Sequence, residues 1–196
     1  FWLYEKDQAE RFVALFYEFD AAIEAQFKSL YESFEALASA RRVWHIEAEE
    51  KVQSKKHAGG ANSKVVRKTI SDFLGSGPAL LKTNVPVPLL PVGKQIIHFL
   101  PDRLLVEAPE GFGVVSYKDL KISVSEVRFC ETDGVPADAE LAGSTWKYVN
   151  NSGAPDARFK NNFELPIAIY EEVHLESASG LNEAIQVSKR GFGDLL

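Results

Sequence analysis

Cysteine is almost absent from this chain of 196 residues, and long apolar segments are missing. The single cysteine, Cys130, cannot form a disulfide within the chain, and no histidine lies near it in the sequence. We therefore expect a buried, unreactive thiol, and a reducing cytoplasmic location fits this composition. Because no run approaches the ~20 apolar residues of a membrane-spanning helix, we predict no transmembrane segment in this chain.

The sequence also lacks the residue patterns of common catalytic and metal sites. The four histidines stand singly, without a second histidine or a cysteine at ligand spacing, and we interpret the row around His174 as a solvated strand face. Residues 75–77 and 111–113 are glycine-rich, but neither continues as a phosphate loop. No serine has a nucleophile-elbow pattern, and no carboxylate pair stands out. We predict no catalytic residue, no metal site and no cofactor, and we expect a protein that is not an enzyme.

Glycine and proline are absent from residues 1–58, which indicates a helical N-terminal segment. Apolar residues recur there at steps of three and four, on one helical face, at Phe12, Phe16, Phe19, Ile23, Phe27, Leu30, Phe34 and Leu37. An unbroken helix over residues 5–42 would be about 57 Å long, longer than a small domain is wide. Asp20 has a side chain suited to a helix cap, so we predict a break there and a helix over residues 21–40.

Two arrangements of this helical segment remain open. In the first, a two-helix hairpin lies on the β-rich half of the protein. In the second, the face formed by Phe12, Phe16, Phe19, Phe27 and Phe34 contacts a protein partner or pairs with another copy in an oligomer. Aromatic-rich stripes are more often core than coiled-coil seam, which favours the hairpin.

The rest of the chain is predicted to form β-strands. The apolar pattern switches to period two over residues 43–48, and a further short strand is expected at 65–70. Four prolines in residues 75–93 predict an extended edge or a surface strap, because proline donates no ladder hydrogen bond. The remaining predicted strands cover residues 94–100, 103–108, 114–117, 121–129, 145–149, 165–176 and 181–187.

Two of these strands have informative patterns. In the strand at 121–129, the apolar positions change from even to odd numbers after Val124, which predicts a β-bulge near Glu126. In the strand at 165–176, apolar and polar residues alternate, with Glu171 as the one interruption of the apolar face. That pattern predicts one buried and one solvated face.

Acidic residues are missing between positions 51 and 71, a stretch that holds six bases. The chain as a whole has a formal net charge of -6, so this basic block is local. Its candidate binding residues are Lys55, Lys56, Arg67 and Lys68, which suit the phosphate backbone of a nucleic acid or an anionic lipid surface. The alternative is a solvated loop that offsets the acidic helical segment.

A second polar segment, residues 150–162, contains the candidate binding residues Arg158, Lys160, Asn161 and Asn162. Donors at this density on a loop between strands can capture an anion or a peptide carboxylate. Asparagine and serine are also the residues that turns use for their own backbone hydrogen bonds, so the alternative is a structural role.

Part of the chain resembles a known family. The resemblance rests on residues 96–106, which match an opening hairpin, and on residues 113–124, which contain the Tyr-x-Asp-Leu entry to the next strand. Over residues 95–188 the chain resembles bacterial pleckstrin-homology-like (PH-like) domains of uncharacterised proteins. The resemblance implies a partly open barrel and a binding or scaffolding role toward proteins or lipid headgroups, rather than catalysis.

Domains of that family usually close one end of the barrel with a C-terminal helix. Here Gly191 and Gly193 oppose a helix at that end of the sequence, which leaves the N-terminal helix to plug the barrel. This is the point at which the chain departs from the family pattern.

These observations predict an α+β protein with three segments. Residues 1–50 form a long helix or helical hairpin, residues 51–93 a basic, proline- and glycine-rich link with short strands, and residues 94–196 an antiparallel PH-like β-barrel or sandwich. The predicted function is a non-catalytic interaction or scaffolding module of a larger bacterial-type protein. The alternative is an anion-binding module that uses the basic block from Lys51 to Lys68.

Overall fold

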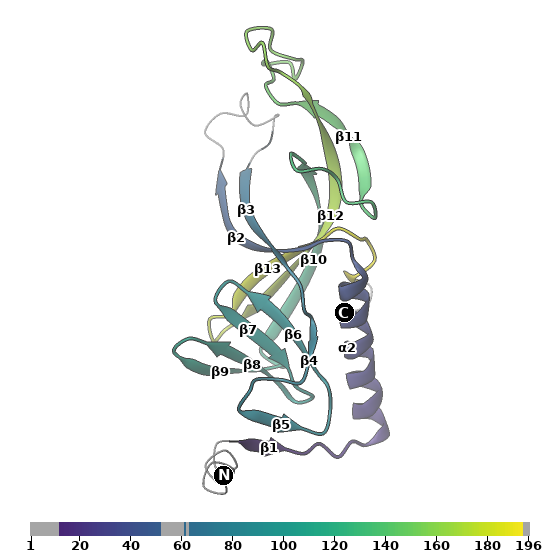
Figure 1. Ribbon diagram of the computed structural model, residues 1–196, viewed down its shortest axis with the longest axis vertical. Coiled ribbons are helices and arrows are strands. Elements are labelled where there is room, and N and C mark those ends of the chain that lie inside the picture. Colours follow the sequence, from purple (N-terminus) through teal and green to yellow (C-terminus); the bar gives the residue numbers. More distant parts are fainter. Residues whose placement is uncertain (1–11, 52–60, 62, 194–196) are drawn as a thin grey trace, which may run out of the picture.

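The computed structural model describes residues 12–51, 61 and 63–193. It has an α+β fold in which one helix precedes strands that pair mostly antiparallel, and the helix runs along one side of an elongated molecule (Figure 1). The elements are β1 (Val13–Leu15), α2 (Ala21–Ser39), β2 (Val43–Lys51), β3 (Ser63–Ile70), β4 (Leu74–Gly75), β5 (Leu81–Thr83), β6 (Val87–Val92), β7 (Gln95–Phe99), β8 (Arg103–Ala108), β9 (Gly111–Ser116), β10 (Leu120–Cys130), β11 (Glu140–Trp146), β12 (Glu164–Ser177) and β13 (Asn182–Val187).

Within residues 12–51 and 63–193 the helical part is one helix, α2, and Asp20 sets its start. The Asp20 Oδ1 atom accepts hydrogen bonds from the amides of Ala22 (3.0 Å) and Ile23 (2.9 Å), two of the donors that a helix N-terminus leaves unpaired. The helix ends at Ser39, after which the backbone is extended. The predicted helix at 21–40 is confirmed to within one residue, whereas the predicted hairpin is wrong.

Residues 12–19, the described residues before Asp20, are not helical because distant parts of the chain bind them. β1 pairs in parallel with β5. The Tyr17 amide donates to the Asn84 side chain (2.8 Å), which donates back to the Tyr17 carbonyl (2.9 Å), and the Tyr17 hydroxyl donates to Asp102 (2.9 Å). These tertiary hydrogen bonds prevail over the helical spacing of the local sequence, because helix propensity is a weak preference.

The predicted phenylalanine face is divided by this arrangement. Phe12, Phe16 and Phe19 lie in the extended segment, whereas Phe27 and Phe34 belong to α2 and are buried. The apolar stripe of α2 packs against the strands of its own chain and is not available to a partner. Five phenylalanines therefore do not form one helical face, and of the five only Phe12 and Phe16 are exposed.

The strands form two larger sheets and one small pair. The six-stranded sheet has the order β10-β12-β13-β2-β3, with β11 also paired to β12; the five-stranded sheet has the order β4-β6-β7-β8-β9. The predicted antiparallel β-rich half is confirmed, but neither sheet closes on itself, so the described strands form no closed barrel. Strand pairing also crosses the predicted segment boundaries, because β2 and β3 share a sheet with β13. The proline-rich β6 was expected at the edge of a sheet. It pairs with β4 over only two residues, so most of that side of β6 has no strand beside it.

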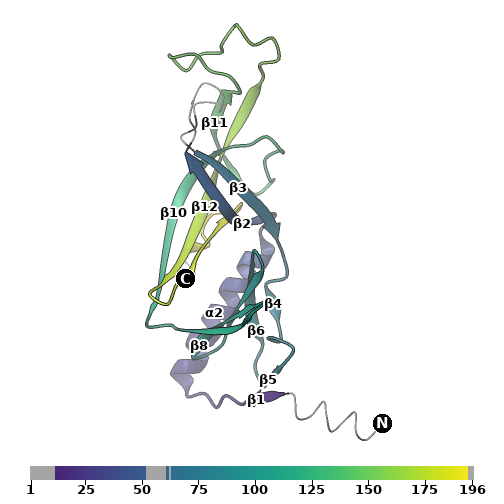
Figure 2. The same ribbon diagram turned by 90° about the vertical axis from the view of Figure 1, so that its left-hand side faces the viewer.

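The main hydrophobic core, which we call the helix core, lies between α2 and the two larger sheets. It includes Phe34 and Leu37 of α2, Phe99 of β7, Val173 of β12 and Ile185 of β13. The Phe34 and Phe99 rings pack at 4.7 Å between centroids. The helix therefore lies on the β-rich half of the protein, and Figure 2 shows α2 behind the five-stranded sheet from the side.

In one half of the six-stranded sheet the strands bury one face, and in the other half they bury the opposite face. In β12, Val173 and Leu175 enter the helix core, whereas Ala168 and Tyr170 enter a second cluster with Trp44. Odd-numbered residues of β12 point to one face and even-numbered residues to the other. A single strand thus contributes to two cores on the two sides of the sheet.

The same change of buried face explains the pattern of β10. β10 pairs with β12 over its full length without a register shift, so the predicted bulge near Glu126 is wrong. The apolar positions change parity because Val127 and Phe129 pack with the second cluster. In the other half of β10, Ile122 and Val124 lie opposite strand residues of the helix core.

Glu171 interrupts the apolar face of β12 for a definite structural reason. Its two carboxylate oxygens accept hydrogen bonds from the amides of Gly191 (2.6 Å) and Gly193 (2.9 Å). Phe192, between the two glycines, enters the helix core. The carboxylate therefore holds the segment after β13 against the sheet, in the stretch where Gly191 and Gly193 were predicted to oppose a helix.

Candidate functional site

Arg67, a candidate from the basic block, lies in the interior of the protein. Its guanidinium carbon is 3.9 Å from the ring centroids of both Trp44 and Phe129. Its Nη2 atom forms an ion pair with Glu131, and Oε1 of the same glutamate accepts a hydrogen bond from the Tyr170 hydroxyl (2.7 Å). We call these five residues the arginine–aromatic cluster.

The arginine–aromatic cluster joins the two end strands of the six-stranded sheet. Arg67 is on β3, at one end, and Glu131 directly follows β10, at the other end. In Figure 1 the β2–β3 pair and the β11–β12 pair rise as two arms above β13. The two side chains are only 10% and 1% exposed, so each charge needs the other in this desolvated position. Arg67 therefore does not present its charge to an external anion.

The other candidates of the basic block are not gathered around Arg67. Lys68 is exposed on the opposite face of β3, because successive strand residues point to opposite sides. Lys55 and Lys56 lie outside the described residues. Binding of nucleic acid or anionic lipid by this block stays a prediction, to which Arg67 contributes no surface charge.

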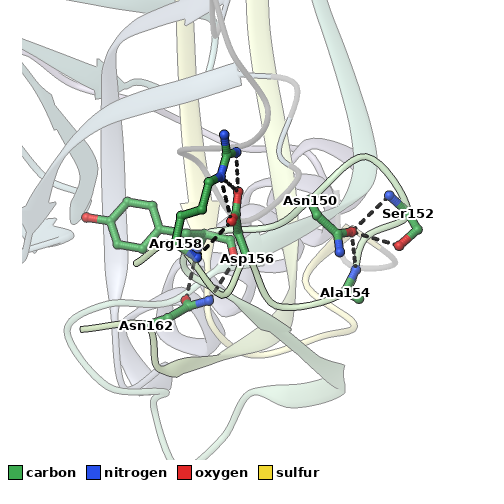
Figure 3. Close-up of polar contacts among 7 residues, drawn as sticks. Asn150, Ser152, Ala154, Asp156, Arg158 and Asn162 are labelled. Atoms are coloured by element: carbon green, nitrogen blue, oxygen red, sulfur yellow. Dashed lines mark hydrogen bonds and ion pairs between the residues drawn. The ribbon is translucent and has the colours of Figure 1, made fainter. Parts of the chain in front are cut away.

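In the polar loop between β11 and β12, Asn150 and Asn162 form hydrogen bonds with backbone atoms near the loop (Figure 3). The Asn150 Oδ1 atom accepts hydrogen bonds from the amides of Ser152 (2.9 Å) and Ala154 (3.0 Å). The Asn162 side chain accepts from the Tyr148 amide (3.0 Å) and donates to the Tyr148 carbonyl (2.8 Å). These contacts fix the loop, so Asn162 has a structural role here.

Arg158 in the same loop has a partner of its own. It forms a two-point contact with the buried Asp156, from Nε to Oδ1 (2.9 Å) and from Nη2 to Oδ2 (2.5 Å). The Arg158 amide donates to the same carboxylate (3.1 Å). Lys160 and Asn161 are exposed. Anion capture by these residues stays a prediction, and the geometry gives Arg158 a structural role.

β9 is an end strand that lacks the usual protection of a sheet edge. Its six residues, Gly111–Ser116, include no charged residue and no proline, and its register with β8 is unbroken. Phe112 and Val114 point to the same side and are 47% and 56% exposed. Such an edge offers unpaired amides and carbonyls to another strand.

The other end strands of the two larger sheets are protected. β3 and β10 each contain three charged residues, β4 has only two residues, and β11 has a register shift beside Gly143. Charge, shortness and bulges are the features by which proteins prevent edge-to-edge pairing. Among the described strands of these sheets, β9 is thus the open edge, and it lies free at one side of the molecule (Figure 1).

Sequence reasoning missed this edge because it predicted a strand only from Val114 and took residues 110–113 as a turn. The absence of charge in Gly111–Ser116 was visible in the sequence. What the sequence did not show is that β10, the next strand, leaves this sheet and pairs with β12 in the other one. That change of sheet leaves β9 paired with β8 on one side and without a strand on its other side.

Comparisons with known proteins assign no family to this fold and these sites. No protein-family model matches the chain, and neither the curated proteins nor the solved structures gave a match. The PH-like resemblance over residues 95–188 therefore stays a prediction. In the part of the chain that the structure describes, no helix is long and apolar enough to span a membrane, and no three metal-binding side chains form a group.

Proposed function

We propose that this chain is a non-catalytic interaction module that joins two copies of itself through antiparallel pairing of their β9 strands. The observation that carries the proposal is the open, uncharged edge Gly111–Ser116 with its two exposed apolar side chains. Strand addition at such an edge satisfies main-chain donors and acceptors on both partners. Each five-stranded sheet then continues into the sheet of the other copy.

The β9 sequence is self-complementary in one register. A two-fold axis through Gly113 places Phe112 of each copy directly opposite Val114 of the other, on the outer face of the sheet. Both exposed side chains thereby gain a cross-strand neighbour, and an aromatic and β-branched pair contributes roughly 0.2–1 kcal/mol. At the axis itself the two glycines bring no side chains into conflict.

The charges that flank β9 agree with this register. Glu110 precedes the strand and Lys118 follows it, so antiparallel pairing brings Glu110 diagonal to Lys118 of the second copy. The net charge of -6 on each copy opposes association at long range, and salt screens that repulsion. We therefore expect association to strengthen as the salt concentration rises, whereas nucleic-acid binding by the basic block would weaken.

The test is the mass in solution of the wild-type chain and of two lysine variants. Val114→Lys places an unpaired charge from each copy in the joined sheet, and we expect the mass to fall from twice 21.8 kDa to 21.8 kDa. Leu141→Lys is the matched control, because Leu141 is 59% exposed, against 56% for Val114, and also lies on an end strand. It should leave the mass unchanged.

Circular dichroism of each variant separates a lost interface from a lost fold. A wild-type chain that sediments as a monomer at millimolar concentration rules the proposal out. So does a folded Val114→Lys variant that remains as dimeric as the wild type.

A further inference from the structure

A cleft of about 420 Å³ lies where the C-terminal end of α2 meets the connection from β3 to β4. Its apolar lining includes Val43 and Phe73, both buried. Its polar lining includes Arg41, Arg42 and Asp72, all exposed. The volume falls within the range of small-molecule sites, and such sites combine an apolar lining with a few polar groups.

The backbone that carries the two arginines is held from both sides. The Arg41 amide donates to Asp138 Oδ2 (2.7 Å), and the Arg42 amide donates to Ser188 Oγ (2.9 Å). The Ser188 amide donates back to the Arg42 carbonyl (2.9 Å). These hydrogen bonds hold the main chain of Arg41 and Arg42 in place beside the cleft.

The guanidinium groups of Arg41 and Arg42 have no ion-pair partner among the described residues. Arg67, Arg103, Arg158 and Arg190 all have one. The carbonyl end of α2 is nearby and favours cations over anions, so a bound anion must be held by the arginines themselves. Two guanidinium groups beside an apolar lining suit the oxygen atoms of a carboxylate or a phosphate.

Asp72 also lines the cleft, and its conformation is unusual. It has a φ of 65° and is the one non-glycine residue with a positive φ in the described part of the chain. Its Oδ2 atom accepts a hydrogen bond from the Ser71 hydroxyl (2.9 Å). A strained residue held beside a cleft is a feature of ligand sites, and this carboxylate can accept a hydrogen bond from a hydroxyl or ammonium group of a ligand.

We propose that this cleft binds a small organic anion with an apolar body, either a carboxylate or a phosphate monoester. Arg41 and Arg42 contact the anionic group, and Phe73 and Val43 contact the apolar body. Asp72 accepts a hydrogen bond from a neutral or cationic donor on the same ligand. This site is independent of the β9 edge. A negative result for one proposal therefore does not count against the other.

Nuclear magnetic resonance titration of the intact chain tests the site with four probes. Benzoate and phenyl phosphate carry both features, inorganic phosphate lacks the apolar body, and benzyl alcohol lacks the charge. We expect saturable shifts at residues 41–42 and 69–74 with benzoate or phenyl phosphate. The affinity for each of the two incomplete probes should be at least about tenfold weaker, a difference of about 1.4 kcal/mol.

Substitutions separate the arginines from general charge effects. The double variant Arg41→Gln with Arg42→Gln should lose at least about tenfold in affinity for the better anionic probe. Arg128→Gln, an exposed arginine on β10 that does not line the cleft, removes the same kind of charge and should keep the affinity. If benzoate and phenyl phosphate give no saturable shifts at the cleft, or shift other regions instead, the proposal is overturned even without the variants.

Discussion

The helix core and the arginine–aromatic cluster lie on opposite faces of the same six-stranded sheet, yet they are built from different chemistry. The helix core is apolar and joins α2 to both larger sheets. The arginine–aromatic cluster is smaller and has an ion pair at its centre, enclosed by Trp44, Phe129 and Tyr170. The first stabilises the fold by burial of apolar surface, and the second by a charge pair that is costly to break.

This difference shows how one sheet can carry two clusters of buried side chains, one on each face. Near α2, the sheet buries one face against a helix and a second sheet. Beyond β13, where the β2–β3 and β11–β12 arms rise apart, the helix core does not extend, and the other face closes around Arg67 (Figure 1). The ion pair joins the two end strands because the buried carboxylate of Glu131 needs the charge of Arg67.

The largest expected effect comes from Arg67→Ala. This change leaves the Glu131 carboxylate buried without its cation, and we expect the free energy of unfolding to fall by about 3–5 kcal/mol. Arg128→Ala, at an exposed site on β10, is the control and should change stability by less than about 0.5 kcal/mol. Urea unfolding measures both. A loss below about 1 kcal/mol for Arg67→Ala would mean that the cluster does not hold the arms together.

Leu37→Ala tests the helix core in the same assay. Leu37 is 1% exposed, so the substitution leaves a cavity, and we expect a loss of about 2–5 kcal/mol. Because no charge is involved, the loss should be the same at low and high salt. A marked dependence of this loss on salt would contradict the distinction between the two regions.

A titration to alkaline pH tests one tyrosine from each of the two regions, and Tyr17 as a third. Burial raises the pKa of Tyr117, beside the helix core, and burial with the hydrogen bond to Glu131 raises the pKa of Tyr170. Burial, and then the hydrogen bond to Asp102, raises the pKa of Tyr17 to about 12. A raised pKa in the folded state gives stability that is complete below the unfolded value of about 10 and is lost as pH rises above it.

We therefore expect stability to decline above about pH 10, and we expect Tyr17, Tyr117 and Tyr170 to ionise late in an absorbance titration. Tyr117→Phe and Tyr170→Phe should each remove one late-titrating group. If all six tyrosines ionise together near their ordinary pKa while the protein is still folded, the burial of these three hydroxyls is wrong.

The smallest expected effect is at the start of α2. Asp20→Ala removes the acceptor for two helix amides, and we expect a loss of about 1 kcal/mol, within a range of roughly 0.5–2. Asp20→Asn should retain most of the stability, since asparagine also caps helices. An equal loss for both substitutions would show that the Asp20 contribution is not a capping effect.

Much of the fold was predictable because strand patterns are local. The predicted strands at 103–108, 165–176 and 181–187 match β8, β12 and β13 to within one residue, and the helix after Asp20 was also predicted. The capping side chain and the two-residue alternation act between near neighbours in the chain. Glu171 was noticed as an interruption, although its partners, Gly191 and Gly193, could not be identified from sequence.

The candidate sites were less predictable, because exposure and partners depend on distant residues. Arg67 lies in a basic stretch of the sequence, which is typical of an exposed binding residue. Its burial depends on Trp44, Phe129 and Glu131 from three other segments. The open edge of β9 depends on β10 leaving the sheet, and the cleft depends on the end of α2 meeting residues 69–74. None of these contacts leaves a periodic signal in the chain.

By itself, the sequence determined the class of the protein, one capped helix and most strand positions, because these follow from interactions within a few residues. Only the tertiary structure decided that Phe12, Phe16 and Phe19 lie outside the helix, that the sheets stay open, and that Arg67 of the basic block is internal. The physical reason is that hydrogen bonds and burial between distant segments can exceed local preferences of a few tenths of a kcal/mol per residue.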